Sequence, residues 1–342
     1  MIALDAMGGD LAPAAAVEGA LRARRERGLS VVLVGDEARI KAELSRLQAK
    51  PGEVELHHAS EVVEMGEHPG QALRRKKDSS IRVCFDLVKS GRCDGMVSAG
   101  NSGAVLAGGL FVLGRLEHVD RPCIGGFLPS LGGMGRVVLV DMGANIECTP
   151  LQLVQFALMG EVFAREVLGI AAPRVGVVAN GEEEEKGTDC TRAAAAALRE
   201  AKGVAFKGYV EGKDVFSGSF DVIATDGFTG NVLLKTAEGA VWAFGQLLKR
   251  EVSASVRAKA GALLLKPALG HVKKAVDYEE VGGAPLLGVD GVAMIAHGRS
   301  SAYAILNAIA HADDFAKKDH IFQHLSEAAF RGEALFGQRA AS

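Results

Sequence analysis

The chain has 342 residues, of which 48% are hydrophobic and 24% are charged, and its formal net charge is -3. These values are typical of a soluble globular protein and disfavour general nucleic-acid binding, which requires a basic surface. The five cysteines have neither metal-ligand spacing nor the even number of a disulfide framework. We therefore expect a reducing, cytoplasmic environment, no metal, and cysteines that act as small buried hydrophobic residues, with a nucleophilic cysteine as the alternative.

A short β-branched strand, a glycine-rich loop and a helix recur in series along the chain. The predicted strands cover residues 2–5, 94–98, 137–141, 174–179 and 221–225. Helices are expected from about Pro13, after Gly103, near Thr149, after Gly187 and from the 226–231 loop to about Arg250, with Thr149 and Gln152 forming a capping box. Such units predict an α/β fold with a mostly parallel sheet and helices on both faces. Open sheets bind ligands at the carboxyl ends of their strands, so we expect the loops to share one edge.

No linker or repeat interrupts the chain, which predicts one domain over residues 1–342. Residues 238–277 are expected to protrude from it as a helical hairpin. Leu263, Leu264 and Leu265 form an apolar run at the expected turn, and the residues from 249 to 274 include seven Lys or Arg and one acid. This combination predicts either a reversible contact with an anionic membrane surface or packing against a dimer partner. We expect neither a signal peptide nor a membrane-spanning helix.

Two loops in the first part of the chain have residues that suit an anion. Asn101, Ser102 and Gly103 join a predicted strand to a helix N-terminus, where free N–H groups and the helix dipole favour negative charge. A basic run that includes Lys76 and Lys77 ends beside Ser80 at the expected start of another helix. A helix cap and a solvated basic turn are the structural alternatives for these two loops.

Two later loops and one histidine are further candidates. Lys186 ends an acidic run, where it either lies in a solvated loop or neutralises an anionic substrate. Asp226 and Asn231 bound a loop whose glycines permit unusual backbone geometry, and Lys235 lies four residues further on, on the same helix face. His297 either binds a ligand or has a structural role in the core or at a helix cap.

Several common motifs are absent from the sequence. The glycine loop at residues 100–103 is not followed by the Lys-Ser/Thr of nucleotide hydrolases, and no dinucleotide fingerprint is present. There is no nucleophile elbow and no His-Glu-x-x-His metal motif. We therefore expect no cofactor.

Together these loops resemble one family, the bacterial acyl carrier protein:phosphate acyltransferases. The matching segments run in order over about nine-tenths of the chain: Asp5–Asp10 with Ala12–Pro13, Lys76–Lys77 with Ser79–Ser80, Ser98–Asn101 with Gly103–Ala104, Asp141 with Gly143–Asn145, Gln155–Ala157 with Met159–Gly160, Gly181–Glu184 with Lys186–Gly187, Asp226–Asn231 with Leu234–Lys235, Gly282–Gly288, and His297–Gly298. Ser102 stands where the family usually has Thr, which keeps the hydroxyl. The family's Asn-Ile-Gly-Glu is Ala179-Asn180-Gly181-Glu182 here, so no role is carried over to Asn180.

The resemblance implies a three-layer α/β fold similar to phosphate acetyltransferases and isocitrate/isopropylmalate dehydrogenases. It also implies a homodimer, a long-chain acyl carrier protein thioester as donor, and inorganic phosphate as acceptor. The acyl phosphate product would serve phospholipid synthesis through a membrane glycerol-3-phosphate acyltransferase, which fits a cytoplasmic protein that associates peripherally with the membrane.

The reaction itself needs little machinery, because phosphate is the nucleophile and a thiolate is a good leaving group. Our hypothesis is that Lys186 and the Asn101–Ser102 loop hold phosphate, while Asn231 donates to the tetrahedral oxyanion. Lys76, Lys77 and Ser80 are weaker candidates for phosphate binding, and no general base is assigned. Two alternatives remain: a phosphate acetyltransferase that uses acetyl-coenzyme A, and a non-catalytic membrane-bound scaffold.

Overall fold

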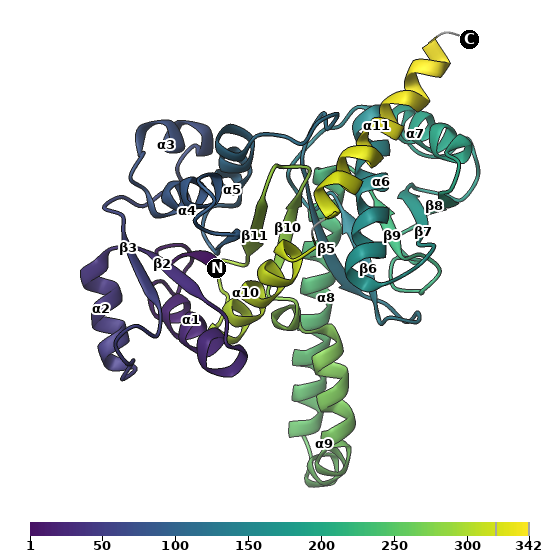
Figure 1. The fold of residues 1–342 in the computed structure, drawn as a ribbon. Helices are drawn as coiled ribbons and strands as arrows, with labels where there is room; N and C mark the ends of the chain where they lie inside the picture. The colour runs from purple at the N-terminus through teal and green to yellow at the C-terminus, as the bar shows by residue number, and fades with distance from the viewer. Residues whose placement is uncertain (319, 341–342) are drawn as a thin grey trace.

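The computed structural model describes residues 1–318 and 320–340. Its described strands form one continuous sheet in the order β3-β2-β1-β4-β11-β10-β5-β6-β9-β7-β8, with helices on both faces (Figure 1). The strands are β1 (Ile2–Asp5), β2 (Val31–Gly35), β3 (Glu55–His58), β4 (Gly95–Ser98), β5 (Cys123–Pro129), β6 (Arg136–Val140), β7 (Arg174–Val178), β8 (Ala205–Val210), β9 (Val222–Ala224), β10 (Gly283–Leu287) and β11 (Val292–Ala296). The predicted α/β fold with a mostly parallel sheet is confirmed.

The sheet has two parallel halves that run in opposite directions. Strands β3, β2, β1, β4 and β11 are parallel to one another, as are β6, β9, β7 and β8. Between them β10 pairs antiparallel with β11 and β5, and β5 pairs antiparallel with β6. Three antiparallel pairings in a row reverse the direction of the second half. The expectation that all the loops share one carboxyl edge is therefore wrong, and they form two groups, one for each half.

The helices occur largely where the sequence predicts them. They are α1 (Ala14–Arg27), α2 (Glu37–Arg46), α3 (Pro69–Arg75), α4 (Ser80–Lys89), α5 (Ser102–Gly108), α6 (Pro150–Leu168), α7 (Asp189–Glu200), α8 (Gly227–Ser253), α9 (Val256–Val276), α10 (Ala302–Ala316) and α11 (Ile321–Ala340). The Thr149 hydroxyl accepts from the Gln152 N–H and the Gln152 side chain accepts from the Thr149 N–H, so the predicted capping box is present. Gly169 ends α6 in the left-handed conformation.

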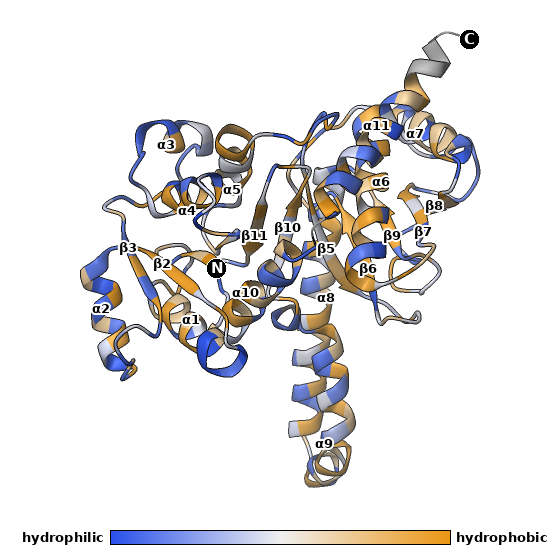
Figure 2. Ribbon diagram, in the orientation of Figure 1, coloured by the Kyte–Doolittle hydropathy of each residue, from blue (hydrophilic) through white to orange (hydrophobic). Residues whose placement is uncertain are grey.

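The core lies along the central strands. Every residue of β1, β2, β4 and β11 is buried, because helices cover both faces of this part of the sheet. Figure 2 shows the apolar character of β2 and β11. Helix α6 is similarly enclosed, with every residue from 153 to 164 buried, because it packs against α11, α7 and the strands of the second half. The strand ends, and the loops that follow them, are thereby held by a rigid frame.

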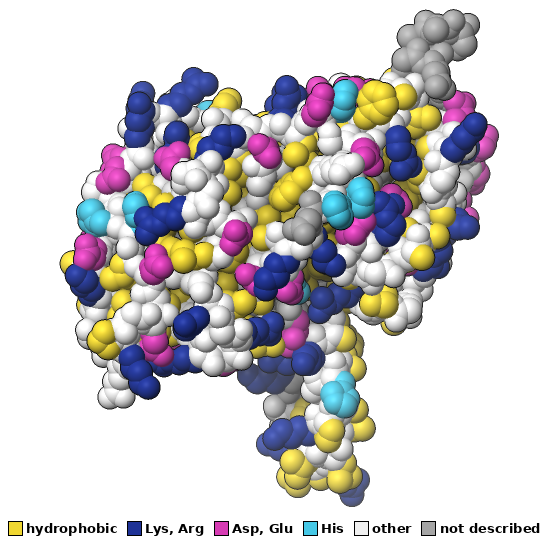
Figure 3. All heavy atoms as spheres, in the orientation of Figure 1, with side chains coloured by type: hydrophobic (Ala, Val, Ile, Leu, Met, Phe, Trp, Pro, Cys, Tyr) yellow, Lys and Arg dark blue, Asp and Glu magenta, His cyan; other side chains and the backbone are white. Residues whose placement is uncertain are grey.

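Helices α8 and α9 form an antiparallel hairpin that protrudes from the body of the molecule (Figures 1 and 3). The turn lies at residues 254–255, where the Ser255 hydroxyl caps α9 by accepting from the Ala258 N–H. The prediction that the leucine run forms the turn is wrong, because α9 continues through Leu263, Leu264, Leu265 and Pro267. Among the described residues, no helix combines the length and the apolar character that a membrane crossing requires.

Candidate active site

A cavity of about 930 Å³ lies at the carboxyl ends of β6, β7 and β9. Its volume is within the range of small-molecule sites, roughly 300–1,000 Å³. Two of the candidate loops from the sequence contribute to its wall, the one between β7 and α7 and the one at the start of α8, together with the loop after β6. The lining residues are Ile146, Glu147, Cys148, Leu153, Val178, Ala179, Asn180, Gly187, Thr188, Cys190, Thr191, Thr225, Asp226, Phe228 and Thr229.

Asp141 organises the loop after β6. Its buried carboxylate accepts hydrogen bonds from the backbone N–H groups of Ile124, Gly143, Ala144 and Asn145, and from the side-chain amide of Asn145, at 2.7–3.2 Å. Burial raises the pKa of Asp141, and the N–H donors counteract part of this effect. The carboxylate thus accepts its hydrogen bonds from groups of the protein, and its role is to hold the loop in its conformation.

The start of α8 is pressed against this loop. The carboxylate of Asp226 caps the helix by accepting from the N–H and the hydroxyl of Thr229, each at 2.8 Å. Gly230 is buried in the first turn, where a Cβ would overlap the carbonyl oxygen of Asp141. The glycine is therefore required for close approach of two backbones. The expectation of unusual backbone geometry is wrong for this residue, which is helical.

Lys186 is not among the lining residues of the cavity, but it directly precedes the lining residue Gly187. Its aliphatic stem covers Gly181, since a Cβ there would lie 2.6 Å from Cγ of Lys186. Asn180 holds the loop in shape by accepting from the N–H of Gly187 at 2.8 Å. Within the described part of the chain, no carboxylate forms an ion pair with the Lys186 ammonium. A half-exposed, uncompensated cation in this position suits an anionic ligand.

Asn231 and Lys235 project from successive turns of α8. Asn231 is exposed and its Cβ packs over Gly143, 3.5 Å from the position of a Cβ at that glycine. Nζ of Lys235 lies 2.9 Å from the Glu238 carboxylate and 3.4 Å from Nε2 of His297, which directly follows β11. Over the nine residues from Asp226 to Lys235, α8 rises about 14 Å. It therefore connects the cavity of the second half with the loops of the first half.

The contact between Lys235 and His297 has an electrostatic consequence. The N–H of Arg299 donates to Nδ1 of His297 at 3.2 Å. Burial, and then the Lys235 ammonium, lower the pKa of His297, which favours the neutral ring. A neutral ring that accepts at Nδ1 carries its proton on Nε2, so two N–H donors face each other. An anionic oxygen between Lys235 and His297 would accept from both.

The loops at the carboxyl ends of β1, β4 and β11 are also joined. The buried carboxylate of Asp5 accepts from the hydroxyl of Ser98 at 2.7 Å, and it is also hydrogen-bonded to Ser80. Burial raises the pKa of Asp5. The N–H of Asp10 donates to the carbonyl of Gly298 at 2.7 Å, which ties the loop after β1 to the loop that carries His297.

Two predicted phosphate ligands, Asn101 and Lys76, form hydrogen bonds with other groups of the protein. The side-chain oxygen of Asn101 caps α5, and its amide group donates to carbonyls of the 64–67 loop at 3.1–3.3 Å. The Lys76 ammonium donates to the carbonyl of Val62 and pairs with Glu67 at 2.6 Å. Ser80 is buried beside Asp5. These contacts give Asn101, Lys76 and Ser80 structural roles, whereas Ser102 and Lys77 are exposed and Gly103 packs against Pro69.

Comparison with known proteins identifies the family. Residues 1–323 match the family model described as a fatty acid synthesis protein. Over 335 residues the chain is 57% identical to a phosphate acyltransferase of Anaeromyxobacter sp. (strain Fw109-5), an alignment that covers 98% of this chain and 92% of that relative. It is 49% identical over 326 residues to a phosphate acyltransferase of Geobacter sulfurreducens, with 95% and 93% of the two chains covered.

This chain belongs to the phosphate acyltransferase family.

Solved structures with a similar fold confirm the fold that the resemblance implies. The EutD phosphotransacetylase from Staphylococcus aureus is 16% identical with a TM-score of 0.58, and a phosphotransacetylase from Streptococcus pyogenes is 18% identical with a TM-score of 0.59. Each alignment covers 92% of this chain and 94% of the other. A 4-hydroxythreonine-4-phosphate dehydrogenase from Klebsiella pneumoniae is 17% identical, with a TM-score of 0.51 and coverage of 93% and 99%. At these identities the likeness concerns the fold alone.

In this member of the phosphate acyltransferase family, the structure indicates roles for two residues whose function the sequence does not reveal. Asp5 and Asp141 lie in segments that match the family, where the sequence indicates no function for them, and each is the buried acceptor that shapes one group of loops. The feature of the sequence that could have indicated this role is their position, an acid at the carboxyl end of an apolar strand.

The interpretation of the cysteines as buried is correct for three of them and wrong for Cys148 and Cys190, which are half-buried in the cavity wall.

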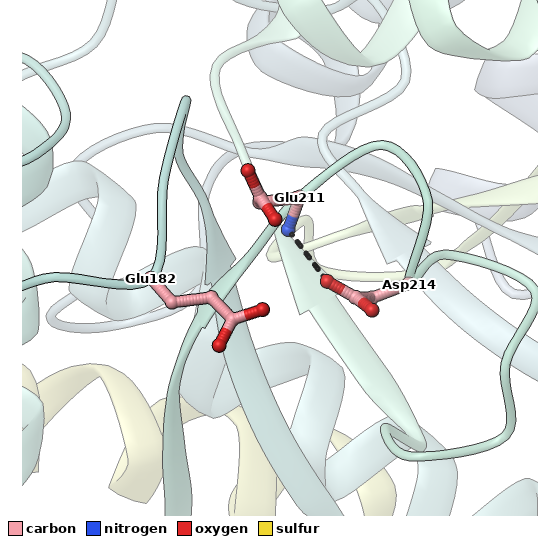
Figure 4. Close-up of side chains that lie close together, drawn as sticks. All are labelled: Glu182, Glu211 and Asp214. Atoms are coloured by element: carbon pink, nitrogen blue, oxygen red, sulfur yellow. Dashed lines mark hydrogen bonds between the residues drawn. The ribbon is translucent and has the colours of Figure 1, made fainter.

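One cluster of carboxylates outside the cavity has the spacing of a metal site. Glu182, Glu211 and Asp214 bring oxygen atoms within 4.8 Å of one another (Figure 4). The ammonium of Lys213 already pairs with Glu182 at 3.0 Å and with Glu211 at 2.5 Å. Two of the three acids thus already have a cation of the protein as their partner.

Proposed function

We propose that this chain transfers a long-chain acyl group from an acyl carrier protein thioester to inorganic phosphate and releases an acyl phosphate. The observation that carries the proposal is the match, over 98% of the chain, to relatives named phosphate acyltransferase. The geometry supports it, because Lys235, on the helix that begins at the cavity, brings its ammonium group together with the imidazole ring of His297. The reaction belongs to fatty acid and phospholipid metabolism.

In the proposed reaction a phosphate oxygen attacks the carbonyl carbon of the thioester. A C–O bond forms, the carbonyl electrons move to oxygen, and the tetrahedral oxyanion collapses with cleavage of the C–S bond and release of the carrier's thiolate. No protein nucleophile is needed. The protein must bring two anionic reactants together and stabilise the oxyanion, for which preorganised donors contribute roughly 3–4 kcal/mol each.

We assign the donors from their positions. Lys235 and Nε2 of His297 present two N–H groups to one place and would hold a phosphate oxygen, with the exposed hydroxyl of Ser102 as a further candidate donor. Asn231, one turn earlier on the same helix, would donate to the oxyanion. Lys186, which directly precedes the lining residue Gly187, would add positive charge. Asn231 is thus placed between the group that binds phosphate and the cavity that takes the acyl thioester.

We further propose that the hairpin mediates dimerisation and peripheral membrane contact. Apolar side chains are exposed along α8, including Trp242 and Phe244, both 68% exposed, which suits helix packing against a second copy. Leu263, Leu264 and Leu265 are 71%, 83% and 57% exposed on α9. Lysines of α9 accompany them, and Figure 3 shows hydrophobic and basic side chains together toward the free end of the hairpin. An anionic bilayer surface offers partners for both, and there a membrane glycerol-3-phosphate acyltransferase would receive the product.

The second candidate function is acetyl transfer from acetyl-coenzyme A, which the fold of the two phosphotransacetylases favours. A donor comparison separates the two. Purified protein is supplied with phosphate and either palmitoyl carrier protein, palmitoyl-coenzyme A or acetyl-coenzyme A, and thiol release is followed. We expect the highest kcat/KM with palmitoyl carrier protein. A clear preference for acetyl-coenzyme A would contradict the proposed donor.

A further inference from the structure

Two thiols lie side by side in the wall of the cavity. Cys148 directly precedes Thr149, the N-cap of α6, and Cys190 is the second residue of α7. Both line the cavity and both are half-buried. Sγ of Cys190 donates to the carbonyl oxygen of Cys148 at 3.3 Å. Two segments that are 42 residues apart in the sequence thus bring a pair of thiols to one place that small molecules can reach.

The environment of this pair differs from that of the other cysteines. The proximity of the two thiols lowers the pKa of Cys190 and raises that of Cys148. The N–H groups and the dipole at the start of α7 favour a thiolate at Cys190 as well. By contrast, burial raises the pKa of the enclosed Cys84 and Cys123 thiols. We therefore expect Cys190 to be the first of the five cysteines to react with an oxidant.

We propose that Cys148 and Cys190 form a reversible disulfide when the protein meets a hydroperoxide. The Cys190 thiolate attacks the peroxide, so that an S–O bond forms, the O–O bond breaks and, for hydrogen peroxide, one water leaves with a sulfenic acid on Cys190. The Cys148 thiol then attacks that sulfur, an S–S bond forms and a second water leaves. Two thiols are oxidised and one peroxide is reduced to two waters. A dithiol reductant reverses the change by thiol–disulfide exchange.

The disulfide would link the loop after β6 to the first turn of α7 across the cavity wall. The same loop contains Asn145, whose side chain is bonded to Asp141, and it lies against the start of α8. A shift there moves Asn231 relative to its substrate, and displacement of a catalytic group by about 1 Å can cost up to roughly 100-fold in rate. Oxidation is therefore expected to inhibit the enzyme. This consequence rests on the proposed function, whereas formation of the disulfide does not.

The test begins with the wild-type protein, treated with hydrogen peroxide, alkylated and digested for peptide mapping. We expect a linked pair of peptides that contains Cys148 and Cys190, loss of two titratable thiols, and recovery of both with dithiothreitol. Absence of that linked peptide after oxidation would overturn the proposal, whether or not the protein is an acyltransferase. This experiment uses only the wild-type protein, so its outcome does not depend on whether a variant folds.

Variants then connect the disulfide to activity. Each rate is compared with the reduced rate of the same variant. Wild type and the control Cys93→Ser, which replaces a buried cysteine away from the cavity, should lose about tenfold or more of their activity on oxidation and regain it on reduction. Cys148→Ser should lose little, because the sulfenic acid of Cys190 then has no thiol partner in the cavity wall. Equal inhibition of all three proteins would overturn the assignment of this pair as the inhibitory site.

Discussion

Nζ of Lys235 lies 3.4 Å from Nε2 of His297, although Lys235 follows a strand of one half of the sheet and His297 a strand of the other. Because the two halves run in opposite directions, their loops would be separated without an element that reaches from one to the other. Helix α8 is that element. It starts at the cavity, packs against Gly143 through Asn231, and reaches His297 through Lys235. The proposed site therefore depends on α8 more than on any single loop.

Changes at this contact should weaken phosphate binding selectively. We expect Lys235→Ala and His297→Gln to raise the KM for phosphate by roughly 10- to 100-fold, since hydrogen bonds to charged groups contribute about 1.5–3 kcal/mol. The KM for the acyl thioester should change little. Initial rates measured as a function of each substrate decide this, and equal increases in both KM values would contradict the assignment of the phosphate site.

Loss of the proposed oxyanion donor or of the cavity cation should reduce turnover. Asn231→Ala and Lys186→Ala are each expected to lower kcat by about 100-fold or more, with the thermal unfolding temperature nearly unchanged because both side chains are at least partly exposed. Lys207→Ala, an exposed lysine on β8, is the control and should retain normal activity. If both site variants work at near-normal rates, these loops are structural turns and the site lies elsewhere.

Two glycines of α8 should respond oppositely to the same substitution. Gly230→Ala places a methyl group against the carbonyl of Asp141 and is expected to destabilise the fold by about 1–3 kcal/mol or more. Gly239→Ala, further along the helix in open space, should stabilise it by up to about 1 kcal/mol through helix propensity. Urea unfolding measures both. A neutral Gly230→Ala would show that the helix start does not press on the 141–145 loop.

The exposed leucines of α9 should bind membranes. Vesicles that contain anionic lipid are expected to sediment the wild-type protein, and a Leu263/Leu264/Leu265→Ser variant should be released, because each leucine withdrawn from water contributes about 1.5–3 kcal/mol. Sedimentation velocity on the same samples reports the oligomeric state. Equal vesicle binding by the two proteins would contradict the membrane contact. A variant that binds vesicles normally but becomes monomeric would assign these leucines to the interface between copies.

Much of the fold follows from local patterns in the sequence. The capping box at Thr149, the apolar strands and the helix after Asp226 are encoded in a few neighbouring residues, and the structure has each of them. The reversal of the sheet is different, since it depends on β10 and β5 pairing with strands that are distant in the sequence. Neither strand was predicted, and periodicity does not reveal pairing partners.

The candidate site, like the fold, could be predicted from the sequence only in part. Residue types indicated which loops suit an anion, and two of those loops, the one before α7 and the one at the start of α8, line the cavity, whereas residues 76–80 and 101–103 do not. The sequence could not show that the amide of Asn101 bonds to the 64–67 loop or that Lys76 meets Glu67, because those partners are defined by tertiary contacts. It also could not show that Lys235 and His297, 62 residues apart, are neighbours.

The most direct test of the account is the reaction itself. Purified protein is mixed with palmitoyl carrier protein and radiolabelled phosphate, without nucleotide and in the presence of a chelator, and the product is trapped with hydroxylamine. We predict a labelled acyl phosphate and a palmitoyl hydroxamate whose amounts rise with phosphate concentration and disappear when phosphate is omitted. Free palmitate formed at a rate independent of phosphate, or no thioester consumption at all, would contradict the proposed function.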